Sequence, residues 1–113
     1  MCNASVLNTV TSKVVEAARE SLGDKLDKVI LYGSYARGDY DEESDLDIMV
    51  LADIPHESCW GEYKKISKLT SGLDLEYDVL LSVHVADCAT VYKYINDLPF
   101  YMNVLSEGVE LIA

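Results

Sequence analysis

A chain of 113 residues, half of them hydrophobic, has the size and composition of one soluble globular domain, and we expect residues 1–113 to form that single domain. No apolar run approaches the roughly 20 residues that span a bilayer, and no secretory signal precedes the first helical pattern, so a cytoplasmic protein is expected. The formal charge of −11, with no cluster of Lys or Arg, makes direct binding to nucleic acid unfavourable.

The first half of the chain predicts one helix and two strands. Apolar residues recur at helical spacing from Val6 to Ala17, which predicts an amphipathic helix over residues 5–22 that ends at Gly23. Two short apolar runs, at residues 29–32 and 46–51, predict buried strands.

The second half predicts three further helices and two strands. A helix presents Cys59, Tyr63, Ile66 and Leu69 on one face, with Gly72 as its C-terminal cap. The alternating residues 73–83 predict a strand, residues 91–98 and 99–107 two consecutive helices, and residues 109–112 an edge strand. This order predicts an α/β (α+β) fold, in which helices flank a mixed β-sheet.

A candidate anion site follows the first predicted strand. The strand leads into Gly33 and Ser34, and the next residues can open a short helix, whose N-terminal N–H groups attract phosphate. Glycine at position 33 leaves room for close backbone approach. Arg37 lies one helical turn beyond Ser34 and can add a positive charge to the same site.

Two carboxylates open the second predicted strand. Asp45 and Asp47 are two positions apart, so their side chains project from the same face of the strand. Neighbouring carboxylates repel one another, which raises at least one pKa unless a cation intervenes. Oxygen ligands of this kind favour hard divalent cations, Mg²⁺ first among them.

A third carboxylate is predicted on the strand over residues 73–83. In a regular strand Glu76 and Asp78 share a face with Leu80 and Ser82. We favour Asp78 as the third acid, because the acid followed by apolar residues at position 78 repeats the pattern that follows Asp47. Glu76 remains the alternative.

Two His–Cys pairs have spacings that a zinc site can use, His56-x-x-Cys59 and His84-x-x-x-Cys88. Three scattered cysteines do not form a disulfide framework. Structural zinc sites usually come from tighter Cys-rich motifs, so the preferred interpretation is two half-buried thiols and two surface imidazoles.

The central motif resembles that of a known family. Gly33-Ser34, ten intervening residues and Asp45-x-Asp47 are similar to the signature of the DNA-polymerase-β-like nucleotidyltransferases, and most similar to the minimal nucleotidyltransferases. The C-terminal stretch from Leu98-Pro99 to Gly108-Val109 is also typical of that group. The resemblance implies the polymerase-β-like core.

The resemblance also implies a mechanism and a partner. Two Mg²⁺ ions would support transfer of AMP from ATP, with Asp45, Asp47 and Asp78 as ligands and Gly33, Ser34 and Arg37 at the phosphates. Minimal nucleotidyltransferases are similar to the MntA-type antitoxins, which adenylylate a tyrosine of a HEPN ribonuclease toxin. A chain of this length leaves no room for an acceptor domain, so a partner is expected to supply the acceptor. A transferase acting on a small cationic molecule and a non-catalytic binding antitoxin remain alternatives.

Overall fold

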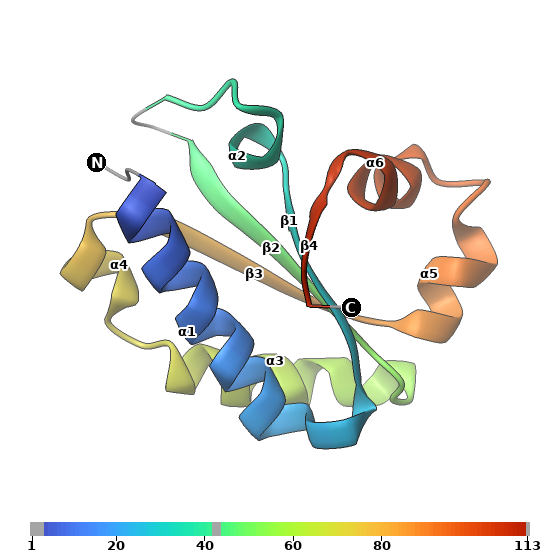
Figure 1. The fold of residues 1–113 in the computed structure, drawn as a ribbon. Helices are drawn as coiled ribbons and strands as arrows, with labels where there is room; N and C mark the ends of the chain where they lie inside the picture. Colours follow the sequence, from blue (N-terminus) through green and yellow to red (C-terminus); the bar gives the residue numbers. More distant parts are fainter. Residues whose placement is uncertain (1–3, 42–43, 113) are drawn as a thin grey trace.

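A mixed β-sheet with helices on both faces forms the centre of the protein (Figure 1). The computed structural model describes residues 4–41 and 44–112. In these residues the sheet has the strand order β3-β2-β1-β4. Its strands are β1 (Leu26–Tyr32), β2 (Asp45–Ala52), β3 (Leu80–Asp87) and β4 (Val109–Ile112). The predicted fold class is confirmed.

The strand directions bring three chain segments to one edge of the sheet. β1 is antiparallel to both β2 and β4, whereas β2 and β3 are parallel. Tyr32, at the end of β1, therefore lies opposite Asp47, near the start of β2. On the other side of β2, Asp47 is in register with Ser82. The end of β1 and the starts of β2 and β3 thus meet at the same edge.

Side-chain alternation along β2 separates the two faces of the sheet. Leu46, Ile48 and Val50 pack in a core cluster beneath α1 (Ala4–Leu22) and α3 (Cys59–Leu69). Met49 and Leu51 pack on the opposite face, beneath α5 (Cys88–Tyr94) and α6 (Pro99–Glu107). All five β2 residues have no exposed surface, and each such burial stabilises the fold by about 1.5–3 kcal/mol. Because successive side chains alternate, Asp45 and Asp47 project toward the α5–α6 side.

The predicted strand over residues 73–83 is wrong in its first half. Residues Leu73–Tyr77 form the short helix α4, and β3 begins only at Leu80. Gly72 precedes this helix with φ 90°, and Asp78 ends it with φ 53° and ψ 53°, the left-handed region that Asp tolerates better than most residues. The alternation of Leu73 with Leu75 was misleading, since Leu73 is buried and Leu75 is 91% exposed.

The other predicted elements are found, with shifted ends in some. The first helix, the two central strands, the helix at residues 59–69 and the edge strand lie where they were predicted, and α6 has the predicted bounds. The helix predicted at residues 91–98 is α5, which spans Cys88–Tyr94. It begins earlier because the Asp87 side chain accepts a hydrogen bond from the Thr90 N–H at 3.0 Å and so caps its N-terminus. Short helices at Gly23–Lys25 (η1), Ser34–Arg37 (α2) and His56–Ser58 (η2) complete the described chain.

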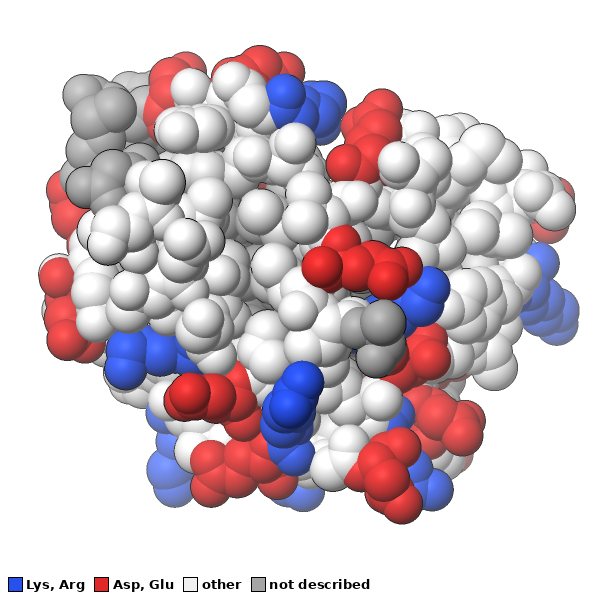
Figure 2. Space-filling model, in the orientation of Figure 1, with Lys and Arg blue, Asp and Glu red and all other residues white. Residues whose placement is uncertain are grey.

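Acidic side chains are spread over the surface that Figure 2 presents, and Lys and Arg gather mainly toward its lower part among further acidic groups. The helices in the described part of the chain include none that is long and apolar enough to cross a membrane.

Candidate active site

Gly33 forms the turn between β1 and α2, and its lack of a side chain has a specific reason. Its backbone has φ 75° and ψ −153°, a region that is essentially restricted to glycine. A Cβ at this position would lie 2.5 Å from Oδ2 of Asp47. The group that approaches the Gly33 backbone is therefore the Asp47 carboxylate, so the Gly33-Ser34 and Asp45-x-Asp47 parts of the sequence motif are in contact.

The short helix α2 follows Gly33 directly and carries Ser34 and Arg37. The N–H groups of Ala36 and Arg37 donate to the Gly33 carbonyl at 3.1 Å, and Gly38 ends the helix in the left-handed conformation. The Ser34 N–H begins the helix, where N–H groups are outside the intrahelical hydrogen bonds.

Arg37 forms ion pairs both with the loop that follows α2 and with the end of α6. Its guanidinium lies 3.2 Å from Oδ2 of Asp39 and 3.9 Å from Oε2 of Glu107, at the end of α6. All three side chains are about half exposed, so these ion pairs contribute little to stability. Their effect is to hold a positive charge near Asp47.

Asp45 and Asp47 lie on one face of β2, as the sequence predicted. Asp45 is exposed and Asp47 is partly buried. Burial raises the pKa of Asp47, the negative charge of Asp45 raises it further, and Arg37 acts in the opposite direction. Two adjacent carboxylates, one of them disfavoured as an anion, form an oxygen donor set that fits a hard divalent cation such as Mg²⁺.

A pocket of about 220 Å³ opens beside Gly33 and Arg37. Tyr32 and Phe100 form part of its wall and contact each other edge to face, with ring centroids 5.8 Å apart. Burial, with a smaller contribution from Asp47, raises the pKa of Tyr32 to about 12, so this phenol is neutral at physiological pH. The other residues that line the pocket, Asn103, Val104 and Glu107, come from α6.

The structure does not bring Asp78 beside Asp47. The residue in register with Asp47 is Ser82, and Asp78 precedes it by four positions, at the exposed end of α4. Glu76 is exposed on α4 itself. Among the described residues, Asp45, Asp47 and Asp78 do not form a group whose ligand atoms lie within 4.8 Å of one another. Asp78 does lie at the same edge of the sheet as Asp45, because Asp45 pairs with Leu80, two residues after Asp78. The role of Asp78 in metal binding stays a prediction.

Sequence reasoning did not assign Tyr32, Phe100, Ser82 or His84 to the site. Ser82 and His84 lie opposite Asp47 and Met49, so they share the α5–α6 face, and the His84 ring stacks near Phe100 with centroids 6.2 Å apart. The polar–apolar alternation of residues 82–85 is a signal for this face. No local pattern marks Tyr32 and Phe100, because the pocket joins β1 to α6.

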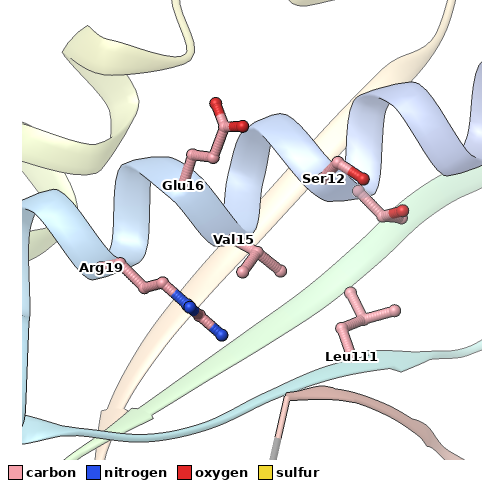
Figure 3. Close-up of a pocket in the computed structure, with 6 residues that line it drawn as sticks. Ser12, Val15, Glu16, Arg19 and Leu111 are labelled. Carbon is pink, nitrogen blue, oxygen red and sulfur yellow. The ribbon is translucent and has the colours of Figure 1, made fainter.

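A second pocket, of about 300 Å³, lies away from these residues, between α1 and β4 (Figure 3). Val15 and Arg19 extend from α1 toward Leu111 of β4 in this view, and Glu16 points away. Val15 and Leu111 pack against the core cluster beneath α1. This pocket is therefore separated by the sheet from the face that carries Asp45 and Asp47.

The chain is similar to known nucleotidyltransferases. The nucleotidyltransferase domain family matches residues 12–111. A Methanocaldococcus jannaschii protein provisionally named protein adenylyltransferase MJ0141 is 44% identical over 80% of this chain and 83% of its own length. A second from that organism, provisionally named protein adenylyltransferase MJ0604, is 37% identical over 83% of this chain and 86% of its own.

Solved structures share the fold. A nucleotidyltransferase-like protein from Sulfolobus solfataricus superposes with a TM-score of 0.60 at 20% identity, covering 96% of this chain and 87% of that one. A toxin–antitoxin complex with AMP-PNP has a TM-score of 0.54 at 21% identity, covering 90% of this chain and 72% of that one. The MntA–HpeT toxin–antitoxin pair is also similar, with a TM-score of 0.54 at 20% identity over the same shares. The chain belongs to the nucleotidyltransferase domain family and is an enzyme of that class.

Proposed function

We propose that this nucleotidyltransferase is an antitoxin that transfers AMP from ATP to a tyrosine of a cognate HEPN ribonuclease toxin, in a Mg²⁺-dependent reaction. The observation that carries the proposal is the carboxylate pair of β2, because its member Asp47 lies against the Gly33 turn and is influenced by the charge of Arg37. The relatives provisionally named protein adenylyltransferases support a protein acceptor, and the similar toxin–antitoxin complexes support a toxin as that protein.

Asp45 and Asp47 would hold the cation. Burial and the charge of Asp45 raise the pKa of Asp47, and a divalent cation beside the pair would add to the opposite effect of Arg37 and favour the ionised form. Bound Mg²⁺ would neutralise the charge that develops on the phosphates and on the leaving pyrophosphate. The Ser34 end of α2 would receive the β- and γ-phosphates, and Arg37 would add a second positive charge there.

The reaction needs little covalent chemistry from the protein. The tyrosine hydroxyl gives up its proton to solvent, and its oxygen forms a bond to the α-phosphorus while the bond from that phosphorus to pyrophosphate breaks. The chain's contribution is to hold the triphosphate in position and to compensate its charge. A free tyrosine, with a pKa of about 10, is a weak nucleophile at neutral pH, so the reaction also needs a group that favours the phenolate. A metal ion held by a third carboxylate would favour the phenolate, and Asp78 is the sequence-based candidate for that carboxylate.

The net charge of −11 supports docking on a basic partner. This acidity favours a basic protein or a small cationic molecule over nucleic acid as the acceptor.

Co-expression with a candidate cognate HEPN toxin tests the proposal. The toxin is purified and weighed by mass spectrometry after expression with wild type, with Asp45→Asn/Asp47→Asn, or with the control Glu16→Gln/Glu20→Gln. The control removes the same charge from exposed positions on α1. One or more added AMP units are expected with wild type and control only. Full neutralisation of the toxin by the Asp45→Asn/Asp47→Asn variant, with no added mass, would instead identify a binding antitoxin.

A further inference from the structure

We propose that His56, Cys59 and Asp87 form a site for a transition metal ion of the zinc class, separate from the nucleotidyl-transfer site. The three residues come from three segments: η2, the first turn of α3 and the last residue of β3. They are the one group of three or more potential metal ligands with closely spaced donor atoms in the described residues.

The donor atoms already lie near the spacing that zinc requires. Nδ1 of His56 is 2.9 Å from Oδ1 of Asp87, Sγ of Cys59 is 3.9 Å from the same oxygen, and all three atoms lie within 4.8 Å of one another. Tetrahedral zinc, with bonds of about 2.0–2.3 Å, separates neighbouring ligand atoms by roughly 3.3–3.6 Å. Small side-chain movements therefore bring the three donors to this geometry.

Asp87 is oriented as a ligand rather than as a surface acid. It is 3% exposed, and its Oδ2 accepts the Thr90 N–H at 3.0 Å, which leaves Oδ1 directed at His56 and Cys59. Metal-binding carboxylates commonly have their second oxygen fixed by such an outer hydrogen bond.

The mixed nitrogen, sulfur and oxygen donor set selects the class of ion. Zinc is bound by combinations of His, Cys and Asp, whereas Mg²⁺ prefers oxygen alone. Three protein ligands leave a fourth position for water, and the His56 side chain is 79% exposed, which gives the ion a path from solvent. A cysteine binds zinc as its thiolate, so binding releases the proton of the Cys59 thiol.

The site is remote from Asp45. Asp87 pairs with Ala52, whereas Asp45 pairs with Leu80, so the two sites are at opposite ends of the parallel strands. Seven residues of strand correspond to roughly 23 Å. A metal here would join the start of α3 to the β3–α5 junction, and binding to the folded state alone would stabilise the fold.

The zinc titration uses calorimetry in excess Mg²⁺, with thermal unfolding as a second readout. One equivalent of Zn²⁺ is expected to bind and to raise the melting temperature. Cys59→Ser and His56→Ala each remove a direct ligand and should each weaken zinc binding by roughly a hundredfold. Mutation of an outer-shell partner alone can weaken metal binding by that much. The control Cys2→Ser/Cys88→Ser keeps Cys59 as the single cysteine and should bind as wild type does.

Cobalt substitution and the catalytic variant complete the test. Co²⁺ should give a thiolate charge-transfer band in wild type that is lost in Cys59→Ser. Asp45→Asn/Asp47→Asn should still bind one Zn²⁺, which separates this proposal from the proposed transferase. Equal zinc affinity in wild type, Cys59→Ser and His56→Ala, or a cobalt spectrum without a thiolate band, would overturn the site.

Discussion

Replacing Gly33 with alanine should impair catalysis more than it impairs stability. The glycine-only backbone conformation, with φ 75° and ψ −153°, costs an alanine about 1–3 kcal/mol. The new methyl carbon would stand 2.5 Å from Oδ2 of Asp47, where ordinary contact begins at 3.4 Å. The carboxylate must therefore move by about 1 Å, and a displacement of that size in a catalytic group costs on the order of a hundredfold in rate.

Gly38→Ala is the matched control. Gly38 also has a positive φ, 84°, but a Cβ there would meet nothing within 4 Å. Its left-handed conformation costs an alanine roughly 1–2 kcal/mol without touching Asp47. Both variants should lose a similar free energy of unfolding in urea. Only Gly33→Ala should lose Mg²⁺ binding by calorimetry and AMP transfer by mass spectrometry. Wild-type transfer by a Gly33→Ala protein that is as destabilised as the control would refute the reasoning.

Three further predictions follow from the site. Without Mg²⁺, Asp47→Asn should raise the free energy of unfolding at neutral pH. The pKa of Asp47 is raised in the folded state, so the wild-type protein loses stability as pH rises from the ordinary carboxyl range through that pKa, and asparagine avoids this loss. Mg²⁺ affinity should decrease as pH is lowered through the same pKa, and Arg37→Gln should move the midpoint of that decrease to higher pH, since Arg37 lowers the pKa. Asp78→Asn should lower AMP transfer at least tenfold if Asp78 is the third ligand, with Glu76→Gln near wild type.

Each of these has a contrary result. Equal or lower stability of Asp47→Asn at neutral pH, in urea unfolding with a chelator present, would contradict the burial argument. If the midpoint of the Mg²⁺-affinity decrease is unchanged in Arg37→Gln, measured by calorimetry across a pH series, then Arg37 does not influence the pKa of Asp47. Unchanged transfer in Asp78→Asn, with a loss in Ser82→Ala, would assign the third position to the residue that is in register with Asp47.

Local patterns in the sequence determined most of the elements and half of the candidate site. Hydrophobic periodicity is sufficient where an element packs one continuous face on the core, as for α1 and α3, and a short apolar run is sufficient for β2, which is buried on both faces. The Gly33–Ser34 turn and the Asp45–Asp47 pair are recognisable because each is a contiguous motif. The two-residue period of a strand places both carboxylates on one face without further information.

Tertiary structure decided every relation between separate segments. The sequence did not show that α4 ends at Asp78 in the left-handed conformation. The prediction therefore placed Asp78 on a strand, whereas β3 starts two residues later, at Leu80. Strand register then places Ser82 opposite Asp47, and the packing of α6 on the sheet brings Phe100 to Tyr32. Likewise, the spacing of His56 and Cys59 gave no reason to include Asp87, which lies 28 residues beyond Cys59 and joins them because β3 runs parallel to β2. Such contacts depend on how strands pair and helices dock, and no local pattern of residues encodes them.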